Sequence, residues 1–326
     1  MFRPTNKKLY ILLFVLVALL GVTVFITYQR HITAYGTLDD IFQSDAIRID
    51  DTIYRRKHDI DTYALIGIDN AGGQADAIFL AVADNQSKDL YLIPVNRNIM
   101  TPIDCYTADG EYLGKQTSQL CLSHSMVYTY ADANLATQNA LSKLLYNVPI
   151  DYYVALEMDG ISALGEAIGD VNLVLNETLE SVDFVKGESV TVHTDNIEQY
   201  LRARDLMKIG GSHKRLERQT SYILACYDKL HSSKGILDIL FHSSDGWSLN
   251  TIRDKYNAVK PYITTNVPDI VNVGAKYLTY TLKDSQVHFI PHTTHQNPET
   301  LYEECYIMES EAKKILLEVF YRPALY

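Results

Sequence analysis

Arginine is concentrated in one short stretch of an otherwise acidic chain. The segment "YLRARDLMKIGGSHKRLERQ", from Tyr200 to Gln219, holds six Lys or Arg residues against two acids, whereas the whole chain has a formal net charge of −11. Guanidinium groups bind phosphate oxygens bidentately and stay charged at any physiological pH. The stretch therefore predicts a site for a multiply charged anion. The alternative is that these arginines pair with the chain's own carboxylates.

The spacing of these arginines is suited to a common ligand. If the chain is extended from Arg202 to Arg204, both side chains point to the same side. On the helix expected to follow, Arg215 and Gln219 are four residues apart and share a face, with Arg218 turned further toward solvent. Two segments are thus expected to converge on one anion.

Two aspartates flank the glycine-rich loop "DNAGGQAD", which begins at Asp69 and ends at Asp76. The glycines allow a sharp turn that would bring both carboxylates to one cation, and oxygen ligands of this kind suit Mg2+. Capping of the backbone by each aspartate is the alternative. The loop is not a dinucleotide-binding or P-loop motif, because it has neither G-x-G-x-x-G nor G-K-[ST].

A further arginine, Arg97 in "PVNRNIMT", directly follows an expected strand. The exit from a strand into a loop commonly carries ligand contacts. Arg97 is therefore a candidate for the same anion site, or else a surface charge at a strand end.

Apolar patterns predict the elements that would position these residues. Short apolar, partly β-branched runs predict strands at 62–68, 77–84, 89–95, 150–158, 170–175 and 287–291. Helical spacing predicts helices at 131–146, 160–168, 195–200 with Asp195 as N-cap, and 213–230 with Ser212 as N-cap. This succession favours an α/β fold in a single domain, 61–326.

The first thirty residues differ from the rest. Residues 9–28 form an uncharged apolar run whose helix would be about 30 Å long, the thickness of the hydrocarbon core of a bilayer. Arg3, Lys7 and Lys8 precede this run and only Arg30 closely follows it, so residues 1–8 are predicted to be cytoplasmic. We expect a single-pass membrane anchor at 9–28, a stalk at 29–60 and an extracytoplasmic domain; a cleaved signal peptide is the alternative.

The charge of the chain argues against nucleic-acid binding, and the spacing of its cysteines argues against a structural zinc site. Without the four positive charges of the first thirty residues, the remaining chain has a net charge of −15, which is not expected of a nucleic-acid-binding domain. The four cysteines lack the C-x-x-C spacing of a structural zinc site. In an exported domain Cys105 and Cys121 could form a disulfide, and Cys226 falls in a helical pattern and could be simply buried.

Five successive segments resemble the motifs of the LytR-CpsA-Psr family: "YALIGIDNAGGQADAIFLAV", "LYLIPVNRNIMT", "QLCLSHSMVYTYAD", "IDYYVALEMDGISALGEAIGDVNL" and "YLRARDLMKIGGSHKRLERQ". The resemblance covers about residues 61–230 together with the N-terminal anchor. Members of that family are extracytoplasmic phosphotransferases that move a glycopolymer, such as teichoic acid or capsular polysaccharide, from a polyprenyl-pyrophosphate carrier to peptidoglycan. The resemblance implies a mixed sheet with helices on both faces, Mg2+ as cofactor, and the carrier's pyrophosphate as the anion.

The resemblance also implies a role for each candidate residue. Its magnesium-binding aspartates match Asp69 and Asp76, and its catalytic arginines match Arg97, Arg202, Arg204 and Arg215. Further substrate contacts are implied at Gln74, Arg218 and Gln219. The chain departs from the pattern at Gln74, where many members carry arginine, and at Asn98, where many carry aspartate. Gln74 brings no charge, and Asn98 cannot accept a proton as a carboxylate does.

Three functions are compatible with these residues. The resemblance implies in-line phosphoryl transfer, in which a sugar hydroxyl of peptidoglycan attacks the glycan-linked phosphorus and polyprenyl phosphate leaves. A binding or regulatory protein that holds the lipid-linked precursor without transferring it is an alternative that Gln74 and Asn98 would permit. A pyrophosphatase, which uses water as the acceptor, is the other alternative.

Overall fold

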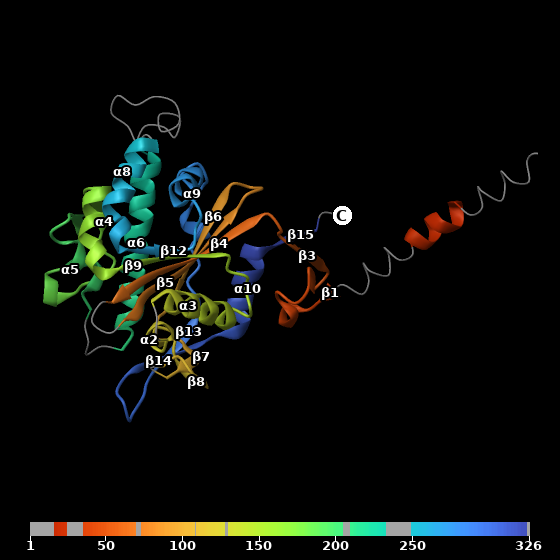
Figure 1. Ribbon diagram of the computed structural model, residues 1–326, viewed down its shortest axis with the longest axis horizontal. Coiled ribbons are helices and arrows are strands. Elements are labelled where there is room, and N and C mark those ends of the chain that lie inside the picture. The colour runs from red at the N-terminus through yellow and green to blue at the C-terminus, as the bar shows by residue number, and fades with distance from the viewer. Residues whose placement is uncertain are drawn as a thin grey trace, which may run out of the picture. The chain divides into compact units, whose positions relative to one another are not determined.

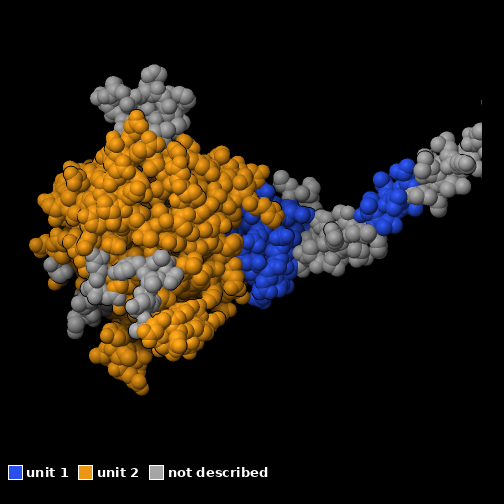
Figure 2. Space-filling model, viewed as in Figure 1, with its two compact units in different colours: residues 1–57, 316–326 blue, residues 58–315 orange. Residues whose placement is uncertain are grey.

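The computed structural model describes residues 16–24, 35–69, 73–107, 109–127, 130–204, 209–232 and 249–324 of the chain (Figure 1). The chain divides into two compact units, coloured separately in Figure 2: residues 1–57 with 316–326, and residues 58–315. All nine candidate site residues belong to the second, larger unit.

The smaller unit contains a four-stranded sheet in the order β1-β2-β3-β15. Its elements are β1 (Tyr35–Gly36), the 3-10 turn η1 (Leu38–Asp40), β2 (Ala46–Ile49), β3 (Thr52–Arg56) and β15 (Tyr321–Pro323). The rings of Phe42 and Phe320 meet edge to face, with centroids 5.0 Å apart. The interval predicted as a stalk, 29–60, therefore contains strands, and one of them, β3, pairs with β15 from the C-terminal part of the chain.

A five-stranded mixed sheet forms the centre of the larger unit, in the order β12-β9-β4-β5-β6. Strand β4 runs parallel to β9, and the other neighbouring pairs are antiparallel. The strands are β4 (Ile60–Asp69), β5 (Gln74–Asp84), β6 (Asp89–Val95), β9 (Tyr152–Glu157) and β12 (Ile263–Thr265). The sequence predicted four of these strands, because each combines an apolar run with β-branched residues.

Side chains alternate between the two faces of this sheet, and both faces are covered by helices. On one face Leu65 and Phe79 belong to a cluster with Leu216 and Ile223 of helix α6. Figure 1 shows α4, α6, α8 and α9 on this side and α2 and α3 on the other. The helices are α2 (Leu122–Ser125), α3 (Tyr130–Leu144), α4 (Ile161–Ile168), α5 (Ile197–Arg202), α6 (Gly211–Ser232), α8 (Leu249–Val259), α9 (Ile270–Tyr277) and α10 (Glu309–Phe320).

Among its described residues, the larger unit also contains three antiparallel strand pairs and four short 3-10 helices. The pairs are β7 (Met100–Tyr106) with β8 (Tyr112–Gln119), β10 (Val171–Val174) with β11 (Ser189–Val192), and β13 (His292–Gln296) with β14 (Glu303–Ile307). The 3-10 helices are η2 (Met158–Gly160), η3 (Glu180–Val182), η4 (Lys260–Tyr262) and η5 (Asp284–Gln286). The fold is thus a mixed α/β structure with several sheets.

Several sequence expectations are corrected by the structure. Helix α5 begins at Ile197 after Asn196, not after Asp195; the Asn196 side chain does not cap the helix but accepts the N–H of His193 (2.7 Å). Helix α6 begins at Gly211, so Ser212 lies inside it and is not its N-cap. Segment 287–291 runs beside β6 and forms an isolated bridge at Val287 rather than a strand.

The expectations for the cysteines and the anchor have different outcomes. All four cysteines are free, so the Cys105–Cys121 disulfide is not formed, while Cys226 is buried as expected. Part of the apolar run at 9–28 lies outside the described residues, and residues 16–24 of it are helical. Within the described ranges, no helix is long and apolar enough to cross a membrane.

Candidate active site

A β-bulge positions the second aspartate of the glycine-rich loop. In the β4–β5 pair, Gly67 is opposite Ala77 and Ile68 is opposite Ala75, so Asp76 has no partner on β4. An extra residue of this kind re-aims a side chain. Asp76 and Ala77 both face the α6 side: Asp76 contacts Arg215 of α6, and Ala77 packs on the cluster that contains Leu216.

Arg97 lies in the turn between β6 and β7 and forms an ion pair with Asp76. Its guanidinium also donates to Gln74 Oε1 and lies 3.1 Å from the sulfur of Cys121. The turn is held by the backbone, because the Cys121 N–H donates to the Arg97 carbonyl (3.0 Å). The neighbouring buried side chain of Asn96 accepts the N–H of Asn98 (3.0 Å). Arg97 is thus fixed over the bulge.

Arg215 approaches the same carboxylate from helix α6. Its Nη1 lies 3.2 Å from Asp76 Oδ2, and its Nη2 donates to the Asp76 carbonyl (3.2 Å). The side chain is only 5% exposed. Burial, followed by the positive charges of Arg97 and Arg204, lowers the pKa of Arg215 to about 9, so it remains a cation at neutral pH. Asp76 therefore holds two guanidinium groups together.

The side chains of Arg202 and Arg204 do not point in the same direction. The prediction that the chain is extended at Arg202 is wrong. Arg202 is the last residue of α5, with Nη1 2.5 Å from Glu198 Oε1 and Nη2 3.9 Å from Asp69 Oδ1. Arg204, two residues on, lines a separate cavity. Helix α5 continues this far because Ile197 and Tyr200 are buried against a core cluster, which outweighs the local pattern.

Arg218 lines none of the cavities described below. It is 1% exposed, donates through Nε to the Tyr200 carbonyl (2.5 Å) and through Nη2 to the Ala203 carbonyl, and forms an ion pair with Glu177. The expectation that Arg218 turns toward solvent is wrong. Gln219 lies near the site, with its amide nitrogen 3.2 Å from the Leu201 carbonyl.

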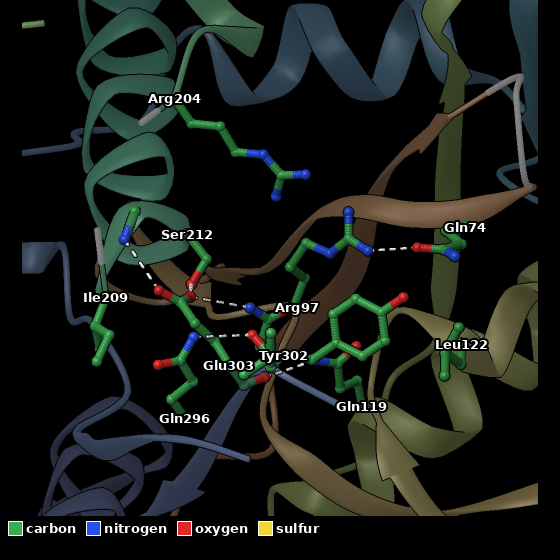
Figure 3. Close-up of a pocket in the computed structure, with 13 residues that line it drawn as sticks. Gln74, Arg97, Gln119, Leu122, Arg204, Ile209, Ser212, Gln296, Tyr302 and Glu303 are labelled. Carbon is green, nitrogen blue, oxygen red and sulfur yellow. Dashed lines mark hydrogen bonds between the residues drawn. The ribbon is translucent and has the colours of Figure 1, made fainter. Parts of the chain in front are cut away.

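A polar cavity of about 580 Å³ lies on one side of Arg97 (Figure 3). The guanidinium groups of Arg97 and Arg204 both point into it. Partial desolvation and the charge of Arg97 lower the pKa of Arg204, and among the described residues Arg204 forms no hydrogen bond or ion pair. Most of the other lining side chains carry amide or hydroxyl groups, and a carboxylate and three apolar side chains are also present: Gln74, Asn98, Gln119, Ser212, Gln296, Tyr302, Glu303, Leu122, Ile209 and Leu301.

Glu303 is a residue of this cavity that the sequence did not reveal. Its carboxylate accepts the N–H groups of Gly210 and Gly211, at the beginning of α6, and the Ser212 hydroxyl (2.6 Å). It also accepts the Asn98 amide (3.2 Å). A carboxylate at this position complements the positive end of the α6 dipole. No motif spacing pointed to Glu303, because Ser212 is 91 residues away in sequence and Asn98 is 205 residues away.

An apolar cavity of about 440 Å³ lies on the other side, between the sheet and helices α4 and α6. Its charged and amide lining groups are Asp76, Arg202 and Gln219. Its walls are apolar or aromatic and include Leu65, Phe79, Val154, Leu156, Ile161, Leu164, Tyr222 and Ile223. A second apolar cavity of about 260 Å³ shares Leu65, Val154, Ile223 and Tyr227 with the first.

The aspartates fit Mg2+ by their donor chemistry. Mg2+ in phosphate-binding sites is usually held by one or two carboxylates together with substrate phosphates and water. Asp69 and Asp76 lie near opposite ends of the β4–β5 connection, and guanidinium groups contact both carboxylates. In the described part of the chain, no group of three or more His, Cys, Asp or Glu side chains could hold a metal ion. A cation here would therefore depend on these two carboxylates and on the ligand.

A family model matches most of the chain. The chain belongs to the LytR_cpsA_psr family, whose model matches residues 28–316.

Relatives and solved structures are consistent with this assignment. A Bacillus cereus protein named polyisoprenyl-teichoic acid–peptidoglycan teichoic acid transferase TagU is 30% identical over 128 residues, which are 38% of this chain and 38% of the relative. The crystal structure of B. subtilis TagV has a TM-score of 0.59 at 15% identity and covers 80% of this chain and 95% of that one. A structure described as TagT bound to LI-WTA has a TM-score of 0.58 at 16% identity, covering 80% and 89%. These structures are similar in fold.

Proposed function

We propose that this protein transfers a glycopolymer from a polyprenyl-pyrophosphate carrier to a sugar hydroxyl of peptidoglycan. One observation carries the proposal: the Arg97–Asp76–Arg215 cluster lies between a polar cavity, lined by Arg97, and an apolar cavity, lined by Asp76. A lipid-linked glycan has the same three parts in the same order, a polyprenyl chain, a diphosphate and sugars. The names of the TagU relatives favour a teichoic acid as the polymer.

The proposed reaction needs positioning and charge neutralisation more than covalent help from the protein. The acceptor oxygen attacks the glycan-linked phosphorus, the bond from that phosphorus to the bridging oxygen breaks, and polyprenyl phosphate leaves with the electron pair. The acceptor proton passes to water. Arg97, Arg204 and Arg215 would hold the diphosphate and neutralise charge on its oxygens, with Arg202 at the edge of the apolar cavity.

Magnesium belongs to the same proposal. Asp69 and Asp76 would hold Mg2+, which when bound would neutralise phosphate charge. Asp76→Asn is expected to raise the Mg2+ concentration that gives half-maximal turnover. An unchanged magnesium response in this variant would remove Asp76 as a ligand. Thermal unfolding of the variant without metal checks that the loss of the Arg97 and Arg215 ion pairs has not unfolded the protein.

The test of function uses the purified protein with a polyprenyl-pyrophosphate-linked glycan, Mg2+ and peptidoglycan. Transfer predicts that polyprenyl monophosphate is released and that the glycan becomes attached to peptidoglycan. Equal release without peptidoglycan would favour the pyrophosphatase alternative. Binding of the lipid-linked glycan with no release would favour a binding or regulatory protein.

We also propose that residues 9–28 anchor the chain in the membrane with the larger unit outside. This would keep the site close to a lipid-borne substrate. Protease added to intact cells is expected to digest the region after residue 30, and the protein is expected to stay with membranes after alkaline washing. Release by the wash would favour the cleaved signal peptide.

A further inference from the structure

The turn between β13 and β14 presents two large apolar side chains to the polar cavity. Leu301 and Tyr302 are 68% and 69% exposed, and both line the cavity. In Figure 3 Tyr302 is among the side chains drawn at the cavity, with Arg97, Gln74 and Gln119. Large apolar side chains beside an open polar cavity commonly mark an interaction site.

This turn is well defined despite its exposure. The Leu301 N–H donates to the Asn297 carbonyl (2.9 Å), and the Asn297 N–H donates to the Tyr302 carbonyl (2.9 Å). The Asn297 side chain also accepts the N–H of Glu299 (2.9 Å) and of Thr300 (3.1 Å). Leu301 has a φ of 61°, a conformation that is unfavourable for a bulky residue. The backbone thus holds both side chains outward at a cost in strain.

The base of the hairpin is fixed to the rest of the site. Glu303, which follows Tyr302, binds the beginning of α6 and Asn98, and its carbonyl accepts the Gln119 amide (2.6 Å). The hydrogen bonds of the Glu303 carboxylate and carbonyl therefore fix the position of the adjacent Tyr302 relative to Arg97 and Arg204. An ordinary surface turn does not need so many contacts to the rest of the protein.

Away from Arg97 and Arg204, the lining of the cavity fits an N-acetylated sugar. Four side-chain amides, from Gln74, Asn98, Gln119 and Gln296, offer both donors and acceptors to hydroxyl and acetamido groups. An aromatic ring offers an apolar surface to the C–H face of a sugar ring. The Glu303 carboxylate already accepts four donors, from Gly210, Gly211, Ser212 and Asn98, and so serves to hold the hairpin in place.

The position of the cavity indicates which sugar it would hold. The attacking and leaving oxygens lie roughly in line with the reacting phosphorus. If the departing polyprenyl phosphate lies toward the apolar cavity beside Asp76, the attacking hydroxyl must come from the opposite side. That side, beyond Arg97, is the polar cavity.

We infer that the polar cavity is the acceptor site, which binds an N-acetylhexosamine glycan with Tyr302 against one sugar ring. The acceptor role rests on the proposed function, whereas glycan binding itself does not. Tyr302, Leu301 and Gln296 of the hairpin recognise the glycan, and Glu303 is a positioning residue that fixes the hairpin.

Direct binding is the first test. A soluble β-1,4-linked N-acetylglucosamine oligomer is titrated into the full-length protein in detergent, and binding is followed by calorimetry. Wild type is expected to bind, and Tyr302→Ala to bind on the order of tenfold more weakly. Tyr306→Ala is the matched control, because Tyr306 is also exposed on β14 but does not line the cavity. Equal binding by Tyr302→Ala and wild type, or no binding by wild type, overturns the inference.

Transfer kinetics are the second test and separate the two proposals. In Tyr302→Ala the KM for peptidoglycan is expected to rise on the order of tenfold, and Tyr302→Phe should restore it because the ring is kept. A rise in the KM for the lipid-linked donor alone would assign the cavity to the donor's sugars and overturn the inference. If wild-type protein binds the oligomer but transfers no glycan, the proposed function is wrong and the proposed glycan-binding site still stands.

Discussion

Two arginine–carboxylate clusters lie on helix α6 only three residues apart, and they have different surroundings. Around Asp76, the guanidinium groups of Arg97 and Arg215 lie between a polar and an apolar cavity. Around Arg218, the partners are Glu177 and the carbonyls of Tyr200 and Ala203, and Arg218 lines neither cavity. The first cluster can exchange its internal partners for a ligand, and the second cannot.

The difference separates binding from stability. In the first cluster one carboxylate faces two guanidinium groups and Arg204 lies nearby, so the cluster carries excess positive charge that a diphosphate would balance. In the second, one guanidinium satisfies one carboxylate and two carbonyls that would otherwise be buried without a donor. The second cluster therefore joins α5 to α6. In this way it fixes the backbone positions of Arg202 and Arg204.

The largest expected effect is on folding, from Arg218→Ala. Removing one partner of a buried ion pair leaves an uncompensated charge, so the free energy of unfolding is expected to fall by about 3–5 kcal/mol. Urea denaturation of the purified protein measures this change. The exposed Arg253 on α8 gives a matched control, because Arg253→Ala should shift stability by less than about 0.5 kcal/mol.

A double variant tests the reason for that loss. If the unpaired Glu177 carboxylate causes much of the destabilisation, Arg218→Ala combined with Glu177→Ala should be more stable than Arg218→Ala alone. A double variant as unstable as the sum of both single variants would show that the carbonyls of Tyr200 and Ala203 are the main partners.

The next effect is on catalysis, from Arg97→Ala. Arg97 is expected to contact the reacting phosphates, so its loss should lower turnover by about 10²- to 10³-fold, or about 2.7–4 kcal/mol of transition-state stabilisation. The release of polyprenyl monophosphate measures it, at a temperature where thermal unfolding shows the variant to be folded. Turnover equal to that of wild type would place the reaction elsewhere, and Arg253→Ala is again the control.

Local patterns predicted the elements that carry these clusters better than the clusters themselves. Strands β4, β5 and β6 and helix α6 were predicted because each buries an apolar run or stripe, which is a property of neighbouring residues. The sequence predicted that Arg218 turns further toward solvent than Arg215, whereas Arg218 is buried, because Glu177 and the Tyr200 carbonyl of other segments bind it.

Two other features of the site were hidden from the sequence for the same reason. The bulge that directs Asp76 toward α6 depends on how β5 pairs with β4. A shift of this register by one residue would turn the Asp76 side chain to the other face of the sheet. Glu303 reaches the beginning of α6 from a hairpin about ninety residues away. Residue types identified most of the candidate residues, and long-range contacts decided which cavity each one faces.

A smaller effect concerns the apolar cavity beside the first cluster. Ile223 of α6 lines both apolar cavities, and Ile223→Trp would fill part of their common wall. The KM for a long-chain polyprenyl donor is expected to rise by up to about tenfold, while a donor with a single isoprenyl unit should be less affected. Leu135→Trp on the exposed face of α3 is the control. Equal KM values for both donors would exclude this cavity as the site of the chain.

The smallest expected effect is a loss of stability in acid through His292, which supports the turn that carries Arg97. Neutral His292 fits its surroundings, because Nδ1 can donate to the Ile290 carbonyl (2.9 Å) while Nε2 accepts from the Asn96 amide (3.2 Å). The orientation of that amide is fixed, since its oxygen accepts the Asn98 N–H. Protonation would place two donors face to face.

Burial, with a smaller contribution from the nearby His213, lowers the pKa of His292 below its usual value near 6.5. The unfolded chain therefore takes up this proton at a higher pH than the folded chain does. The contribution is fully present above about pH 6.5 and is lost as the pH falls through that value toward the lower pKa of the folded state. His193 contributes to the pH dependence of stability with the opposite sign, because its hydrogen bond with Asp170 raises its pKa.

Thermal unfolding between pH 7 and pH 5 should show a smaller decrease in Tm for His292→Gln than for wild type. Identical decreases would mean that His292 accepts its proton without disturbing Asn96, so that the support of the Arg97 turn is insensitive to pH.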